Sequence, residues 1–197
     1  MDTCSTYLSS DAFRSGPCPT EEELSKRLAS YLSYRYAASY WGDHAREAGK
    51  ASRLVLHLLG SGPRFEGLFQ AYSVHRHRVS VELTVKVPRR LQRLHAAVYF
   101  GIYDAVKHLI QADSPDLRDS DGRTPLSLAA YYGYADIIKL LLEANVSVDS
   151  RDRGGGRPFY GLYSPTSRRQ LNCCSKLGGP MLTQEMIAGL RRCTWLL

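Results

Sequence analysis

The sequence lacks a hydrophobic stretch long enough to cross a membrane. Its apolar runs, such as Leu54–Leu59, fall far short of the roughly 20 residues that a spanning helix needs, and His57 interrupts this one. The N-terminus also lacks a basic residue followed by an apolar core, so no secretory signal is indicated. The odd count of 5 cysteines, with Cys173 next to Cys174, suits neither a disulfide framework nor a zinc site. We therefore expect an intracellular protein, cytoplasmic or alternatively nuclear, that contacts no membrane.

The composition excludes fibrous and fully disordered chains. Of the 197 residues, 44% are hydrophobic and 23% are charged, as in ordinary globular proteins. The net charge is +7, but the basic excess lies in residues 1–93 and 153–197, whereas residues 94–152 contain more acidic than basic residues. A nucleic-acid-binding protein would concentrate its basic residues on a well-patterned element. Because this chain does the opposite, we do not expect nucleic acid as its partner.

Residues 19–59 are predicted to be helical. Thr20 and Glu23 form a capping box at the start of the segment. Apolar residues then recur at helical spacing, at Leu24, Leu28, Tyr31 and Leu32. Gly42 and Gly49 are expected to separate two further segments. Five aromatic residues cluster here, and we favour a helix-packing core over a ligand-binding box for Tyr31, Tyr34, Tyr36, Tyr40 and Trp41.

Residues 60–93 give a weaker pattern. Gly60–Pro63 is predicted to be a turn, and it is no phosphate-binding loop because no strand precedes it and no Gly-Lys-Ser/Thr follows it. Apolar and polar residues alternate over 79–87, which predicts a strand. His75 and His77 lack the further ligands that a metal site needs, so we interpret them as part of a solvated basic stretch.

An internal repeat dominates residues 94–152. Shifting Leu94–Asp113 by 32 positions places it on Leu126–Asn145. Each unit predicts an alanine-rich helix, a glycine turn, a second helix with a leucine ridge, and a polar loop. The identical pairs are Leu94/Leu126, Ala97/Ala129, Tyr99/Tyr131, Gly101/Gly133, Asp104/Asp136, Lys107/Lys139, Leu109/Leu141 and Ala112/Ala144.

The stretch Gly122–Gly133, GRTPLSLAAYYG, resembles the ankyrin repeat, whose pattern is G-x-T-P-L-x-x-A-A-x-x-G. Thr124 supplies a helix cap, and Pro125 occupies the first helical position, where no amide hydrogen is needed. The resemblance implies an all-α fold, an ankyrin-repeat helical solenoid with two recognisable repeats. We divide the chain into a helical extension or cap (1–87), the ankyrin repeats (88–156) and an irregular tail (157–197).

Residues 3–59, on the stretches 4–24 and 34–47, resemble the helical segment that precedes the ankyrin array in fungal NACHT–ankyrin proteins, which are similar to NOD-like receptors. The resemblance implies a fragment of a sensor whose ankyrin repeats bind partners and whose NTPase domain lies upstream. No Walker A lysine motif is found in this chain, so no NTPase activity is carried over. The sequence departs from the repeat pattern at Ala96, where a larger apolar residue is usual.

The ankyrin resemblance also implies a binding surface. In such a stack the loop tips and first helices form a concave face. The aromatic residues just before the turn glycines are predicted to point outward and anchor a protein partner: Tyr99, Phe100, Tyr131 and Tyr132. The loop tip supplies Arg118, Asp119, Ser120, Asp121 and Arg123. The alternative for the aromatic residues is packing on the neighbouring repeat.

We expect no catalytic residues, cofactor, metal or small-molecule substrate. Asp119–Gly122 lacks the glutamate that completes a calcium loop, because Ala130 stands at that position. Cys4 and Cys18 are expected to be inert. The predicted function is a non-enzymatic protein–protein interaction module. The alternatives are a basic helical regulatory or nucleic-acid-binding protein, and a truncated gene product without a function of its own.

Two repeats are fewer than the three usually needed for a continuous core, so the helices of 20–59 are expected to cap the first repeat. The second repeat has no recognisable cap. Its residues 137–142 are therefore expected to stay partly exposed and to favour weak self-association.

Residues 157–197 are interpreted as ankyrin sequence read in the wrong frame. The repeat pattern stops after Gly156, where a third T-P-L start is due. When the third base of each codon is joined to the first two of the next, the genetic code permits T-P-L-L-W-A over 156–162. It likewise permits V-K-L-L-L-E-T-G-G-A-D-A-D-S-R-D over 170–186 and T-P-L-H-L-A-A over 190–197. The tail would then be irregular and its basic charge without function; the alternative is a genuine basic binding tail.

Overall fold

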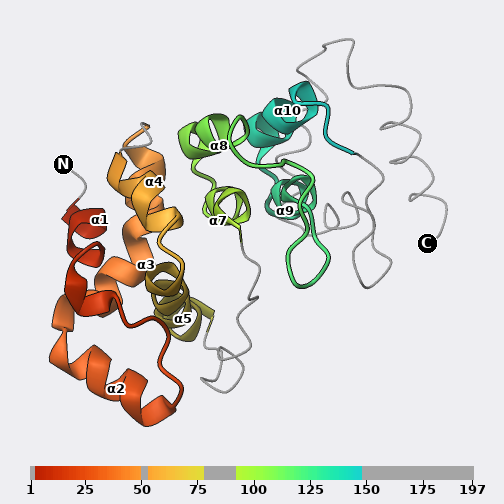
Figure 1. Cartoon of the computed structure of the whole chain (residues 1–197). Coiled ribbons are helices and arrows are strands. Elements are labelled where there is room, and N and C mark those ends of the chain that lie inside the picture. Colours follow the sequence, from red (N-terminus) through yellow and green to blue (C-terminus); the bar gives the residue numbers. More distant parts are fainter. Residues whose placement is uncertain (1–2, 50–52, 78–91, 148–197) are drawn as a thin grey trace, which may run out of the picture.

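The computed structural model describes residues 3–49, 53–77 and 92–147 (Figure 1). All regular structure in these ranges is helical, as expected for the all-α class. The strand predicted over 79–87 and the tail over 157–197 lie outside the described residues. The elements are α1 (Thr3–Leu8), the 3-10 helix η1 (Asp11–Phe13), α2 (Glu21–Ser30), α3 (Leu32–Glu47), α4 (Arg53–Leu59), α5 (Pro63–His77), α7 (Arg93–Tyr99), α8 (Tyr103–Leu109), α9 (Pro125–Tyr132) and α10 (Ala135–Glu143).

Figure 1 shows two groups of helices that stand next to each other. Helices α1 to α5 form the N-terminal group, and the pairs α7–α8 and α9–α10 form the repeat group. Helix α7 packs against α9 and α8 against α10, while α4 contacts α7 across the junction. One hydrophobic cluster extends through both groups, from Cys4 to Val146. Within the described ranges, no helix has the length and apolar character needed to span a membrane.

Two helices begin where their sequences predict. At the start of α2, Thr20 Oγ1 accepts a hydrogen bond from the Glu23 amide at 3.3 Å. At the start of α9, Thr124 Oγ1 accepts from the Ser127 amide at 3.3 Å, and Pro125 follows as the first helical residue. Each threonine satisfies one of the N–H groups that a helix leaves unpaired at its start. The Thr124 cap and the threonine half of the capping box at Thr20 are confirmed.

Helix α3 passes through Gly42, where a break between segments was expected. The prediction was wrong because this glycine serves packing and not a turn. Gly42 is buried, and a Cβ atom built on it would lie 2.5 Å from the ring of Phe100. Gly49 does follow the end of the helix, with a φ of +61° in the left-handed region that glycine favours.

The aromatic residues of this region divide between core and surface. Tyr34 and Trp41 are buried, and the ring of Tyr34 stacks on Phe13 with centroids 4.4 Å apart. The core interpretation is confirmed for these two residues. It was wrong for Tyr36, which is 54% exposed. Tyr31 lies at the edge of the core, with its ring 5.1 Å from that of Phe13.

Helix α5 was not predicted from the sequence, which indicated only a turn at Gly60–Pro63. The side chain of Gln70 is buried and pairs with both backbone groups of Cys18: its Oε1 accepts from the amide and its Nε2 donates to the carbonyl, each at 2.7 Å. A Cβ atom on Gly67 would lie 2.7 Å from the Gly16 carbonyl oxygen. Neighbouring segments therefore contact α5 on more than one side. Its buried residues do not follow the single apolar stripe from which an amphipathic helix is predicted.

The two helical pairs close in the same way. Gly101 and Gly133 adopt φ values of +68° and +72°. The residue after each glycine donates its amide to the carbonyl five positions earlier, at 3.0 Å in both pairs. This left-handed closure ends α7 and α9 and lets the second helix of each pair fold back. The small residues between the helices are fully buried, including the atypical Ala96: the set is Ala96, Ala97, Ala105, Ala129 and Ala130.

Candidate protein-binding surface

The loop between α8 and α9 is built around Asp119, whose side chain is 0% exposed. Its Oδ1 accepts from the amides of Asp121 at 2.9 Å and Arg123 at 2.8 Å. Its Oδ2 accepts from Nε of Arg123 at 2.8 Å. Asp119 was predicted to belong to the protein-binding loop tip, and in the structure its carboxylate is buried within that loop. The residue instead fixes the shape of the loop, because a buried carboxylate needs this many donors.

The surface of the loop is formed by its other polar residues. Arg118 is exposed and its Nη1 donates to the Gly122 carbonyl at 2.9 Å. Asp121 is 59% exposed at its side chain and pairs with Nη2 of Arg123 at 2.8 Å. Ser120 is half-buried between them. The loop tip therefore presents charges of both signs from a backbone that is held in one conformation.

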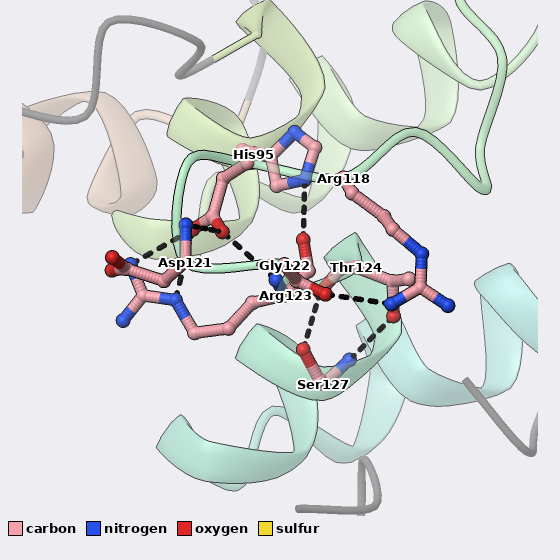
Figure 2. A network of polar contacts seen from close by, with 8 residues as sticks. His95, Arg118, Asp121, Gly122, Arg123, Thr124 and Ser127 are labelled. Carbon is pink, nitrogen blue, oxygen red and sulfur yellow. Dashed lines mark hydrogen bonds and ion pairs between the residues drawn. The ribbon is translucent and has the colours of Figure 1, made fainter. Parts of the chain in front are cut away.

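His95 joins this loop to α7. The imidazole is fully buried, and its Nε2–H donates to the Arg123 carbonyl at 3.0 Å, as Figure 2 shows. Burial lowers the pKa of His95; the hydrogen bond to Arg123 and the charge of Asp119 oppose this shift, and the charge of Arg123 adds to it. The neutral imidazole is therefore the form that the fold favours.

Stability is expected to fall as the pH is lowered through the ordinary histidine pKa of 6.5. Because the pKa of His95 is lower in the folded chain, the unfolded chain binds the proton first, and the stabilisation is complete only above that pH. Urea unfolding of the wild type and of His95→Gln from pH 8 to pH 5 measures the effect. The variant keeps an N–H donor but does not titrate, so it should lose less stability over this range. Equal slopes for both proteins would contradict the assignment to His95.

The four aromatic residues predicted to point outward differ widely in exposure. Tyr131 is 56% exposed, and Tyr99 and Tyr132 are half-buried. The outward orientation was wrong for Phe100, which is only 6% exposed and packs on Trp41 with ring centroids 4.8 Å apart. The difference arises because the N-terminal helices cover the end of α7.

Half-buried tyrosines form a row between the two helical groups. The ring of Tyr99 lies 5.1 Å from that of Tyr132 and 6.0 Å from that of Tyr72, both edge-on, and Tyr132 stacks on Tyr134 at 5.8 Å. Burial raises the pKa of Tyr132 to about 12, and burial together with the neighbouring tyrosines raises that of Tyr99 further. These hydroxyls therefore stay protonated and able to donate at physiological pH.

A pocket of ≈ 180 Å³, the junction pocket, opens beside this row. Its polar lining includes Asp43 and Arg46 from α3 and Arg76 from α5. The other lining residues are Ser39, Tyr72, Tyr99, Phe100, Tyr132 and Tyr134. The contributions of α3 and α5 were not predicted, because no local sequence pattern indicates that Arg46 and Arg76 lie beside the repeat.

Comparison with known proteins agrees with this architecture. A family model described as "Ankyrin repeats (3 copies)" matches residues 47–177. The chain belongs to the ankyrin-repeat family. The two repeats were predicted over 88–156. The family match is longer at both ends, so the ankyrin pattern extends beyond the predicted boundaries.

Individual relatives match the chain over part of its length. An ankyrin repeat-containing protein of Schizosaccharomyces pombe is 36% identical over 55 residues, 28% of this chain and 27% of that protein. The ankyrin repeat and SAM domain-containing protein 3 of Homo sapiens is 45% identical over 58 residues, 28% of this chain and 9% of that protein. Serine/threonine-protein kinase 12 of Arabidopsis thaliana is 40% identical over 60 residues, 30% of this chain and 13% of that protein. The aligned segments thus span about a quarter or less of these relatives.

The described residues of this ankyrin-repeat chain hold no group of three or more histidine, cysteine or acidic side chains that would suit a metal ion. Cys4 and Cys18 are both buried. Burial raises the pKa of the Cys18 thiol, which disfavours the reactive thiolate. The candidate binding features among the described residues are the loop tip, the exposed Tyr131 and the junction pocket.

Proposed function

We propose that the chain is a non-enzymatic protein–protein interaction module that binds a partner through the face formed by its loop tip and the tyrosines of α9. Tyr131 supports this most directly, because an aromatic side chain that is 56% exposed offers a large contact area at low entropic cost. The loop leads directly into α9 through the Thr124 cap, and α9 carries both tyrosines.

The resemblance of residues 3–59 to the segment that precedes fungal NACHT–ankyrin arrays supports a narrower proposal. In this proposal the chain is part of a NOD-like sensor inside the cell, and its ankyrin repeats recognise the partner. The frame-shift interpretation of residues 157–197 is a separate proposal. It leaves the binding surface unchanged, because the residues that form this surface lie outside the tail.

Replacing Tyr131 by alanine tests the binding surface. We expect about a tenfold loss of affinity for the partner, since an aromatic anchor at an interface contributes about 1–2 kcal/mol or more. Partners recovered by the wild type in a quantitative pull-down are compared with those recovered by Tyr131→Ala, with Tyr103→Ala on α8, 41% exposed, as a matched control.

Equal recovery of every partner by all three proteins would exclude this surface. Binding of the partner by the wild-type chain should also depend only moderately on salt concentration. A steep fall in binding between low and physiological salt would favour the alternative of a basic nucleic-acid-binding protein.

A further inference from the structure

The junction pocket exists only where the N-terminal helices meet the repeats. Helices α3 and α5 supply one side, and α7 together with the end of α9 supplies the other. Its ≈ 180 Å³ is less than the roughly 300–1,000 Å³ typical of sites for drug-sized ligands. We propose that the junction pocket binds a carboxylate side chain from an acidic segment of the protein partner. This inference rests on the proposed function, because it names the chemistry of the partner.

Two guanidinium groups share one carboxylate in the pocket. Nη2 of Arg46 lies 2.6 Å from Oδ1 of Asp43, and Nη2 of Arg76 lies 3.8 Å from Oδ2 of the same residue. Asp43 is the one acidic residue among those that line the pocket, so the lining has an excess of positive charge. Each guanidinium carries five N–H donors, more than a single shared carboxylate accepts. A second carboxylate is the group that would complete this arrangement.

Both arginines are accessible and already held in place. Their side chains are 44% and 43% exposed, for Arg46 and Arg76 respectively. The Arg76 guanidinium lies over the ring of Tyr40, 5.4 Å from its centroid, and Nη1 of Arg46 donates to the Phe100 carbonyl at 3.4 Å. Side chains that are ordered before binding lose less entropy when a ligand arrives. The planar guanidinium also suits a carboxylate, which can accept two N–H bonds at once.

The walls of the pocket match the rest of an acidic side chain. Tyr72, Tyr99 and Tyr132 line the pocket beside the arginines, and Phe100, which is only 6% exposed, lines it as well. The methylene groups of a glutamate would lie against these rings while its carboxylate meets the arginines. Because the tyrosines are half-buried, the pocket is partly shielded from water, and the charge interaction is stronger than on an open surface.

The charge pattern favours an acidic peptide over a nucleic acid. Residues 94–152 contain more acidic than basic residues, so a long polyanion lying across the repeats would be repelled. A peptide can carry its negative charges only at the pocket end, whereas a nucleic acid carries one at every phosphate.

Two substitutions of opposite sign test the proposal. Arg46→Gln should weaken binding of an acidic peptide about tenfold or more, because a charge-assisted hydrogen bond is lost. Asp43→Asn should strengthen binding by roughly threefold, because the competing carboxylate is removed. Lys107→Gln, an exposed position on α8 outside the pocket, removes the same charge as Arg46→Gln and is the matched control. All three positions are solvent-accessible, so the variants are expected to fold.

The probe is a fluorescein-labelled peptide in which glutamate alternates with serine, measured by anisotropy with the full chain. Its glutamine counterpart and a single-stranded DNA of equal charge are measured in parallel. The proposal is supported if the chain binds the glutamate peptide but neither the glutamine peptide nor the DNA. The affinity for the glutamate peptide should also fall in Arg46→Gln, rise in Asp43→Asn and stay unchanged in Lys107→Gln. No binding up to about 1 mM, equal effects of Arg46→Gln and Lys107→Gln, or tighter binding of the DNA overturns the proposal. Loss of the partner by Tyr131→Ala alongside an unaffected Arg46→Gln would overturn the pocket assignment and leave the proposed function intact.

Discussion

Replacing Phe100 by alanine is expected to lower the free energy of unfolding by about 3–5 kcal/mol. The ring is 6% exposed, and its centroid lies 4.8 Å from that of Trp41, 5.1 Å from Tyr72 and 6.3 Å from Phe65. All three neighbours belong to the N-terminal helices, so the substitution opens a cavity at the point where these helices contact the first repeat. In a repeat protein much of the stability comes from such interfaces between neighbouring layers.

Urea unfolding followed by tryptophan fluorescence and by far-UV circular dichroism measures this loss. With the second tryptophan, Trp195, replaced by phenylalanine in every protein compared, Trp41 reports on the junction. Circular dichroism reports on all helices together. Tyr103→Ala is the matched control, because this aromatic residue stands at the start of α8 and is 41% exposed. Tyr103→Ala should change the free energy of unfolding by no more than about 0.5 kcal/mol, as for most surface positions. If the two variants unfold at the same urea concentration, Phe100 does not hold the junction together.

The features that the sequence predicts correctly depend on neighbouring residues. The caps at Thr20 and Thr124 each involve an amide three positions away, and the turns at Gly101 and Gly133 each require a left-handed φ. The repeat itself is visible because two segments of the chain show the same local pattern. Such short-range signals do not depend on what packs against the element.

The exposure of the aromatic residues could not be predicted, because it depends on the adjacent layer. Phe100 and Tyr132 occupy equivalent positions in the two repeats, and so do Tyr99 and Tyr131. Phe100 is buried by the N-terminal helices, and Tyr99 is covered by Tyr132 of the following repeat. Tyr131 is 56% exposed at the equivalent position of the second repeat. The same motif residue therefore belongs to the core or to the surface according to its neighbours.

Helix α5 and the junction pocket were missed for the same reason. Gln70 pairs with Cys18, 52 positions earlier, and Arg46 contacts the carbonyl of Phe100, 54 positions later. Sequence periodicity reports on one face of one element and is silent about contacts at such separations. The candidate site therefore combines a loop that the sequence does indicate with a pocket that only the tertiary structure assembles.

Asp119→Ala is expected to lower the free energy of unfolding by about 3–5 kcal/mol, as is typical when one partner of a buried ion pair is removed. The carboxylate is fully buried and accepts from the amides of Asp121 and Arg123 as well as from the Arg123 guanidinium. Alanine would leave these donors without their acceptor. The Arg123 carbonyl also accepts from His95, so a displaced loop disturbs α7 as well.

A graded series separates the buried carboxylate from the exposed ion pair. Asp121→Ala removes the other carboxylate that pairs with Arg123, but its side chain is 59% exposed, so its loss should not exceed about 1 kcal/mol. Asp119→Asn keeps an oxygen for the two amides and removes only the charge, so its loss should fall between the two alanine variants. Urea unfolding at neutral pH gives the order. Equal stability of Asp119→Ala and Asp121→Ala would contradict this prediction. It would mean that surface charges, and not the buried Asp119 carboxylate, stabilise the loop tip.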